Sequence, residues 1–324
     1  MSSPMLHPER PDAACGAAVP TQEVIWVRAV DAGERADADR WCAAVGTPAV
    51  RNAAAGFRDG VPPLVVVSWN THVGGGDIER LVADVRSGRL TGQAPRSFVL
   101  LLQEVLRHDD SVPERAPAGS RLASAVTPTT PDRSRRGIEM TASALGLSMF
   151  YVPSMRNGEG PEDRGNAILS SITLDDLEAI ELPLERQRRV AVAADIRIRA
   201  AAPVTIRIVS VHFTNMVAHH LWVLSEPGRV RQAHALTMAL DDDRPTVLGG
   251  DLNSWFGYSD AAFRELARVL PLSHPEDRRA TFGPMRLDHV LARLPDGWQI
   301  RVRRAESRYG SDHYPLIATI DAPH

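Results

Sequence analysis

The chain has 324 residues with a formal net charge of −3, and hydrophobic residues make up 44% of it, enough for a sizeable buried core. The nearly balanced charge excludes a general electrostatic attraction to nucleic acids or to membrane surfaces. The N-terminus lacks the apolar segment of a signal peptide, and no run approaches the roughly 18 apolar residues of a membrane span. We therefore expect a cytoplasmic, monomeric protein without a stable membrane anchor. Cys15 and Cys42 lie far apart in the sequence, so a disulfide scaffold is not expected.

The N-terminal sixty residues differ in composition from the rest of the chain. Residues 1–20 are rich in Pro, Ala and Ser and are predicted to be disordered. Residues 21–60 are expected to form an accessory extension that packs on the main domain. Within this extension, the apolar run 24–27 predicts a short strand, and residues 31–45 predict a helix that stops at Gly46.

The main domain is expected to cover residues 61–324 and to begin with a strand–helix–strand pattern. Residues 64–70 form a short apolar run that is typical of a strand buried on both faces. A glycine loop follows, and the next apolar residues recur at helical spacing until Gly88. Residues 98–104 predict a second buried strand. This alternation favours an α/β fold.

The second half of the chain is richer in strands. Residues 190–198 alternate with a period of two, and residues 204–212 repeat the pattern, so the two runs predict a hairpin. Further elements are predicted in the order helix 229–240, strand 246–251, a helix after Ser259, and short strands at 287–292, 299–303 and 316–320. Two strand-rich halves that each carry helices predict two packed sheets with helices outside them.

Polar side chains recur at the ends of these apolar runs, and they are candidate functional residues. The set comprises Asn70, Glu104, His212, Asp251, Asn253 and Asp288, with Ser311, Asp312 and His313 before the last strand. Each has an ordinary structural explanation, as a carboxylate just beyond a strand, a tight turn or a capped turn. Together, their carboxylate and amide oxygens suit a hard cation such as Mg²⁺ or Mn²⁺. A histidine oriented by an aspartate adds an acid–base group, so the set indicates metal-assisted phosphoester hydrolysis.

The same motifs resemble those of the endonuclease/exonuclease/phosphatase superfamily, which includes DNase I. The matching segments follow in family order: Ser68-Trp69-Asn70, Leu102-Gln103-Glu104, Gly165-Asn166-Ala167-Ile168-Leu169-Ser170, Val211-His212-Phe213, Gly250-Asp251-Leu252-Asn253, Arg286-Leu287-Asp288-His289 and Ser311-Asp312-His313. They span residues 64–320, and seven ordered motifs are far more specific than any one of them. The resemblance implies a DNase I-like four-layer α/β sandwich, in which two packed mixed β-sheets are flanked by helices and the site lies at one end of the sheets.

The resemblance also implies a metal site and an acid–base pair. Glu104 is the expected principal Mg²⁺ ligand, with Asn70 and Asp312 completing or flanking the metal site, and Mn²⁺ is an alternative ion. Asp288 is expected to orient His313, which activates water or stabilises the attacked phosphate. If His313 must be neutral to accept a proton, activity falls on acidification through its pKa.

The remaining roles concern water and phosphate. By resemblance, Asp251 positions or deprotonates the nucleophilic water, Asn253 holds phosphate oxygens, and His212 stabilises the phosphate or protonates the leaving group. Whether Asp251 or His313 is the general base stays open. Asn166 and Asn215 are expected to be further contacts to the substrate phosphate. The last candidates are possible supporters for which a solvated position is the better expectation: Arg164, Arg229 and Gln232.

The substrate is the least determined feature. Met285 stands where abasic-site endonucleases carry an aromatic residue, only 5% of residues are aromatic, and the isoelectric point is near 6.4. A phosphodiesterase or nuclease-type enzyme is therefore favoured over abasic-site repair, and the substrate can be a nucleic acid, a nucleotide or a lipid headgroup. Two alternatives stay open: a phospholipid or inositol-phosphate phosphatase or sphingomyelinase-type hydrolase, and a catalytically silent binding protein of the same fold.

Overall fold

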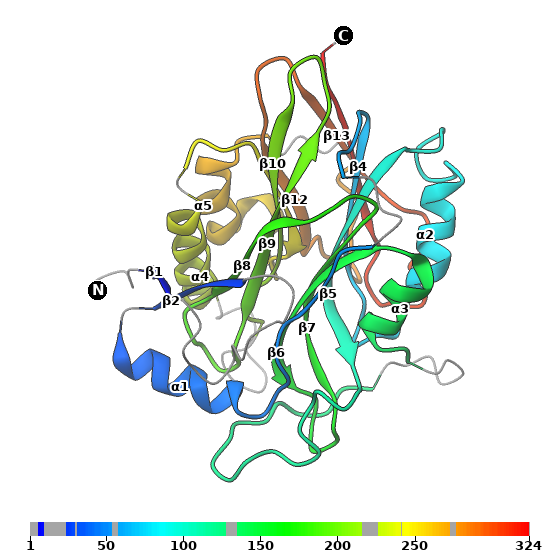
Figure 1. Cartoon of the computed structure of the whole chain (residues 1–324). Coiled ribbons are helices and arrows are strands. Elements are labelled where there is room, and N and C mark those ends of the chain that lie inside the picture. The colour runs from blue at the N-terminus through cyan, green and yellow to red at the C-terminus, as the bar shows by residue number, and fades with distance from the viewer. Residues whose placement is uncertain are drawn as a thin grey trace.

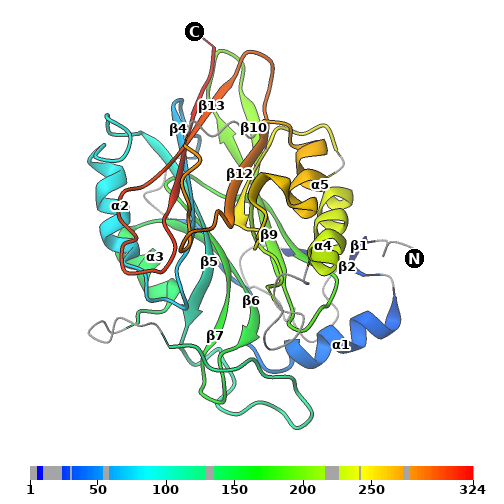
Figure 2. The same cartoon turned by 180° about the vertical axis from the view of Figure 1, so that it is seen from behind.

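The computed structural model describes residues 6–9, 24–29, 31–53, 58–127, 135–215, 226–240, 242–272 and 277–323. These residues form the predicted four-layer α/β sandwich, with two sheets face to face and helices on both outer surfaces (Figures 1 and 2). The disorder expected for residues 1–20 falls outside the described residues, apart from one short strand at Leu6–Glu9.

Each sheet has seven strands. The first sheet has the order β1-β2-β8-β9-β10-β11-β12, formed by Leu6–Glu9, Val24–Ala29, Asp175–Glu181, Val190–Ile198, Val204–His212, Thr246–Asp251 and Asp288–Arg293. The second has the order β13-β14-β4-β5-β7-β6-β3, formed by Gln299–Arg304, Leu316–Asp321, Leu64–Asn70, Ser97–Arg107, Asp163–Ser170, Ser148–Arg156 and Ala49–Arg51. The predicted hairpin is confirmed, because β9 and β10 pair antiparallel.

The helices lie outside the sheets. They are α1 (Ala32–Cys42), α2 (Ile78–Arg86), α3 (Ile138–Leu145), α4 (Glu226–Ala239) and α5 (Ala261–Val269), with the 3₁₀ turn η2 (Gly257–Ser259) before α5. Figure 1 shows α4 and α5 on one side of the sandwich and α2 and α3 on the other. None of the helices in the described ranges is long and apolar enough to cross a bilayer.

Three apolar layers hold the sandwich together. The central layer joins the facing surfaces of the two sheets, with Val66 and Leu101 from one sheet and Ile208 and Val247 from the other. A second layer lies under α2 and α3, and a third lies under α4 and α5. Strands β4 and β11 are buried along their whole length, which explains why their sequences are almost continuously apolar. Their polar terminal residues, Asn70 and Asp251, are therefore held in fixed positions.

The N-terminal segment joins both sheets. Strand β2 pairs in parallel with β8 of the first sheet, and β3 pairs antiparallel with β6 of the second. Helix α1 lies between these strands, and its Trp41 packs against Met155 of β6. The predicted strand and helix are thus present. Cys42 at the end of α1 is disulfide-bonded, a cross-link that its wide sequence spacing did not predict, and its partner lies outside the described residues.

Candidate active site

Three neighbouring strands of the first sheet place polar side chains in a row. His212 ends β10 and Asp251 ends the parallel strand β11, and the two residues are partners in the register. Asp288 begins β12 and lies opposite Asp251. All three side chains are buried. The register of these three strands therefore aligns an imidazole and two carboxylates.

The second sheet contributes Asn70 and Glu104 from its central strands. Asn70 ends β4, where it pairs in register with Gln103 of β5. The next residue, Glu104, lies in a break of register between β5 and β7 and has a φ of 51°. Such a left-handed backbone is strained for a residue with a side chain, and bulges of this kind redirect a side chain at functional sites. The break thus sets the direction of the Glu104 carboxylate.

A hydrogen bond connects the two sheets at this end of the sandwich. Nδ2 of Asn70 donates to Oδ2 of Asp251 at 3.0 Å, and the backbone N–H of Asn253 donates to the other oxygen, Oδ1, at 2.9 Å. The close approach is possible because Gly249 faces Ser68, where a Cβ on the glycine would lie 2.7 Å from the Cβ of the serine. Gly249, two residues before Asp251, therefore lets the two sheets approach each other at the site.

His313 and Asp288 form a buried pair. Nδ1 of His313 lies 2.8 Å from Oδ2 of Asp288, and Nε2 lies 3.9 Å from Oδ2 of Asp251. Burial opposes the charged imidazolium, but the neighbouring carboxylates, Asp288 foremost, outweigh it and raise the pKa of His313 to about 10. The predicted pairing of these two residues is what the structure shows, and the histidine is protonated at neutral pH.

The surroundings of Asp251 disfavour its charged form, whereas those of His313 favour the charged form of the imidazole. Burial, together with the charge of the Asp288 carboxylate, raises the pKa of Asp251 to about 7, although His313 and the hydrogen bonds from Asn253 and Asn70 act to lower it. A carboxylate that titrates near neutral pH can take up a proton from water and release it again. Among the residues of the cluster, Asp251 is therefore the one suited to proton exchange at pH 7.

His212 lies between Asp251 and an arginine that the sequence analysis did not single out. Nε2 of His212 is 3.4 Å from Oδ2 of Asp251, and Nδ1 is 3.1 Å from Nη1 of Arg189. Burial, and next the adjacent Arg189 cation, lower the pKa of His212 well below its ordinary value. Arg189 follows Arg186-Gln187-Arg188, and such a charged run is typical of a solvated loop before a strand. The sequence pattern therefore does not indicate that Arg189 is buried.

Two groups of ligand atoms at this end could hold a cation. Atoms of Asp251, Asp288 and His313 all lie within 4.8 Å of one another. The other group is the predicted set, in which the side chains of Glu104 and Asp312 keep 20% and 37% of their surface exposed. In the first group the Asp288–His313 hydrogen bond and two donors to Asp251 already occupy oxygen lone pairs. Glu104 and Asp312 offer hard oxygen ligands in contact with solvent, the type of ligand that a hydrated divalent cation takes.

The predicted phosphate contacts are positioned differently from one another. Asn253 has a φ of 48°, and its Nδ2 donates to the carbonyl of Phe213 at 3.0 Å. Asn166 is buried, and its Nδ2 donates to the carbonyl of Val190 at 2.7 Å, so it links the two sheets. Asn215 is half-buried, and its Oδ1 has no hydrogen-bond partner among the described residues. The structure therefore uses Nδ2 of Asn166 in a hydrogen bond between the sheets, and the unpartnered atom of Asn215 is an acceptor, which does not bind a phosphate oxygen.

The three possible supporters are buried rather than solvated. Arg229 is fully buried and forms an ion pair of 2.8 Å with Asp260, which caps α5. Gln232 accepts a hydrogen bond from the backbone N–H of Thr214. Arg164 is also buried, two residues before Asn166 on β7. The expectation of solvated side chains was wrong, because α4 turns the face with Arg229 and Gln232 toward the sheet and Arg164 lies in the fully buried strand β7.

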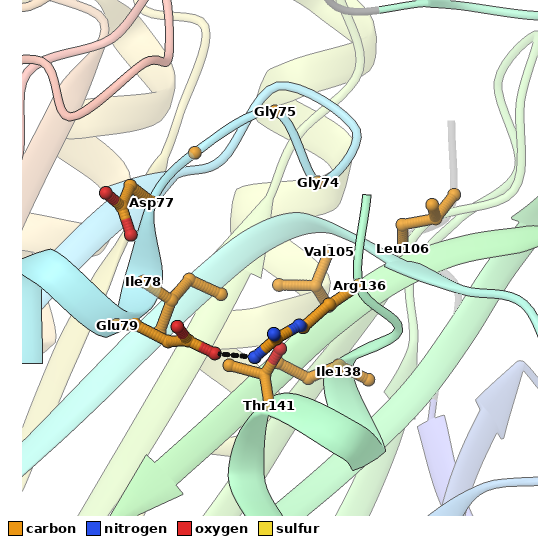
Figure 3. A pocket seen from close by; sticks show the side chains of 11 residues that line it. Gly74, Gly75, Asp77, Ile78, Glu79, Val105, Leu106, Arg136, Ile138 and Thr141 are labelled. Atoms are coloured by element: carbon orange, nitrogen blue, oxygen red, sulfur yellow. Dashed lines mark hydrogen bonds and ion pairs between the residues drawn. The ribbon is translucent and has the colours of Figure 1, made fainter. Parts of the chain in front are cut away.

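A cavity of about 260 Å³ lies beside the cluster but does not include it. It is formed by the glycine loop 74–76, the first turn of α2, the end of β5 and the start of α3, and an ion pair between Arg136 and Glu79 crosses it (Figure 3). The backbone N–H of Gly74 donates to the carbonyl of Glu104 at 3.1 Å. The loop thus forms the wall between the cavity and the backbone of Glu104.

Comparison with known proteins identifies the family. The sequence profile of the Endonuclease/Exonuclease/phosphatase family matches residues 67–313, more than half of the chain. The matched span includes every residue of the cluster. No curated protein matches the sequence significantly.

Solved structures show the same DNase I-like fold. An endonuclease/exonuclease/phosphatase from Beutenbergia cavernae aligns with a TM-score of 0.52 and 17% identity, over 80% of this chain and 71% of the other. A functionally unknown conserved protein from Enterococcus faecalis gives 0.52 and 16%, over 80% and 100% of the two chains. The human Nocturnin catalytic domain with a bound sulfate anion gives 0.52 and 16%, over 82% and 96%. The chain therefore belongs to the endonuclease/exonuclease/phosphatase family and is an enzyme that hydrolyses phosphoester bonds.

Proposed function

We propose that the protein is a Mg²⁺-dependent phosphodiesterase that attacks its substrate with an activated water molecule. The observation that carries this proposal is the position of Asp251. Its carboxylate accepts a hydrogen bond from Asn70 of the other sheet. It also lies within 4 Å of a ring nitrogen of His212 and of one of His313. A proton-exchanging carboxylate with a histidine on either side is suited to activate water next to a phosphate.

The metal is assigned to the group of oxygen ligands that is open to solvent. Glu104 would be its main ligand, with Asn70 and Asp312 beside it. Oδ1 of Asn70 accepts one hydrogen bond, from the backbone N–H of His72, which leaves a lone pair for a further contact. Family members are in general dependent on divalent metals. When bound, Mg²⁺ polarises phosphoryl oxygens and neutralises part of their charge.

Side chains of the protein carry out the proton transfer and stabilise the phosphate. Asp251 takes a proton from the water, since its pKa is near neutrality. His313 stays protonated beside Asp288 and donates from Nε2 toward the charge that develops on the phosphate. Asn253 is held in a left-handed turn directly after Asp251 and contributes amide hydrogen bonds to the same phosphate. His212 faces the cluster from the side opposite to the Asp288–His313 pair.

The substrate class is a phosphodiester in a nucleic acid, a nucleotide or a lipid headgroup. An oxyanion site in this fold has a parallel in the Nocturnin catalytic domain, which was crystallised with sulfate, a tetrahedral anion of the same shape as phosphate. The isoelectric point near 6.4 argues against duplex DNA, and the small aromatic content leaves few side chains on which the bases of a single strand could stack. Both features favour a small substrate.

Hydrolysis of bis-p-nitrophenyl phosphate tests the proposal. Turnover should require Mg²⁺, stop with a chelator and return when Mg²⁺ is restored. A panel of plasmid DNA, RNA, sphingomyelin, phosphoinositides and inositol phosphates then identifies the substrate branch. Metal-independent turnover would reject the proposed metal dependence, and faster hydrolysis of p-nitrophenyl phosphate than of the diester, both followed by release of p-nitrophenol, would favour a phosphatase.

A further inference from the structure

Arg189 is buried beside His212 without a carboxylate partner among the described residues. Arg189 is only 6% exposed, and its Nη1 donates a hydrogen bond of 3.1 Å to Nδ1 of His212. Its Nε atom is buried and has no partner there. The preceding residue, Arg188, is equally buried but is neutralised by Glu181 at 2.6 Å. Since an unpaired buried charge is costly, the position of Arg189 calls for a role at the site.

The guanidinium determines which nitrogen of His212 carries a proton. An arginine side chain only donates hydrogen bonds and does not lose its proton in proteins. Nδ1 of His212 must therefore accept with its lone pair, which leaves the ring neutral with its proton on Nε2. A proton on Nδ1 would instead face the Nη1–H group at 3.1 Å, and this hydrogen bond would be lost. Oε1 of Glu104 lies 3.8 Å from the same nitrogen, too far to replace it with a hydrogen bond of its own.

The protonated nitrogen faces the catalytic cluster. Nε2 of His212 lies 3.4 Å from Oδ2 of Asp251, on the side of the ring away from Arg189. The register pairs His212 with Asp251 on adjacent parallel strands, and the side chain of His212 is buried, so packing opposes a turn of the ring away from Asp251. An N–H group is therefore held toward the place where the proposed function puts the phosphate.

We propose that Arg189 is a positioning residue that holds His212 in its neutral Nε2–H form, so that His212 donates a hydrogen bond to a phosphoryl oxygen and keeps its proton throughout the reaction. This proposal rests on the proposed function. It decides between the two roles that the sequence left open for His212, and it leaves protonation of the leaving group to water.

Nitrogen-15 NMR of the histidine rings tests the proposal without any turnover. The spectrum of His212, assigned by its loss in His212→Gln, should show an unprotonated Nδ1 and a protonated Nε2 at neutral pH in the metal-free full-length protein. Arg189→Met removes the donor but keeps most of the side chain, and the ring should then exchange between both tautomers or take a proton on Nδ1. Arg188→Met is the matched control, because it alters stability without touching His212.

Two results would overturn the proposal: a protonated Nδ1 in the wild type, or an unchanged tautomer in Arg189→Met. Kinetics add a second readout. Arg189→Met should lower kcat by roughly 10- to 100-fold, the range for residues that orient a functional group, with a smaller effect on KM. Arg189→Lys keeps a cationic donor and should restore part of the loss. Because the NMR result does not depend on activity, a failure of the proposed function would be seen separately.

Discussion

Asp288 and His313 are 25 residues apart in the sequence and share a hydrogen bond of 2.8 Å that is closed to solvent. Both sheets hold this pair in place. Asp288 starts β12 of the first sheet. The backbone N–H of His313 donates to the hydroxyl group of Ser311, which in turn donates to the carbonyl of Asn70 in the second sheet. A strand of each sheet thus contributes to the position of one imidazole. The electrostatics of this pair lead to the first two predictions.

Activity should rise with pH through about 7. Asp251 must lose its proton to accept one from water, and its pKa is about 7, whereas His313 stays protonated up to about 10. The measurement is kcat/KM on bis-p-nitrophenyl phosphate between about pH 5 and 9 at saturating Mg²⁺, a span of about two units on either side of the Asp251 pKa. His313→Gln removes a positive charge that lowers the pKa of Asp251, so the rise should move to higher pH. A rate that shows no step near pH 7 and is still rising tenfold per pH unit at pH 9 would instead identify His313 as the base.

Stability should fall as pH rises above neutrality. The folded-state pKa of His313, about 10, lies above the ordinary value near 6.5. Its contribution is therefore fully present below pH 6.5 or so and is lost as pH rises through 10. Thermal unfolding of the metal-free protein should show a falling midpoint between about pH 7.5 and 10, and the fall should be shallower in Asp288→Asn. Parallel curves for the two proteins would contradict this linkage.

Glu104→Gln should abolish most activity while leaving the fold intact. The neutral amide is a weaker ligand for Mg²⁺ than the carboxylate, and we expect kcat/KM to fall by at least about 100-fold at a fixed Mg²⁺ concentration. The control is Glu79→Gln, which breaks an exposed ion pair with Arg136 at the neighbouring cavity. A matched Mg²⁺ titration should show weaker binding in Glu104→Gln but not in Asp288→Asn. The reverse order would assign the metal to Asp251, Asp288 and His313.

Arg229→Met should cost stability rather than catalysis. Removing one partner of the fully buried Arg229–Asp260 pair leaves an uncompensated carboxylate, a change that typically costs about 3–5 kcal/mol. Urea unfolding measures this loss, and kcat/KM of the folded enzyme should stay within about twofold of the wild type. Arg231→Met breaks a pair in which the arginine is half exposed, so its cost should stay below about 1 kcal/mol. A catalytic defect in Arg229→Met without a change in stability would contradict the structural role.

The sequence predicted the cluster because its residues end apolar strands, and buried strands have few ways to be arranged. His212, Asp251 and Asp288 follow from the register of β10, β11 and β12 once these strands are assigned. Arg189 and Arg229 could not be predicted in the same way. Both are charged residues in charged surroundings, and their burial is decided by partners far away in the sequence. The backbone of Glu104 is a further case, because a break of strand register leaves no composition signal.

The N-terminal segment has a consequence for the whole molecule. Strand β3 is the outermost strand of one sheet, and β2 with β1 covers the corresponding side of the other. A shortened chain that began near residue 61 would expose unpaired backbone N–H and C=O groups of both β6 and β8. Exposed strand borders of this kind pair readily with other molecules. The segment thus replaces the longer borders of β6 and β8 by the short edge strands β3 and β1, which offer less backbone for pairing with another molecule. None of its described residues belongs to the catalytic cluster.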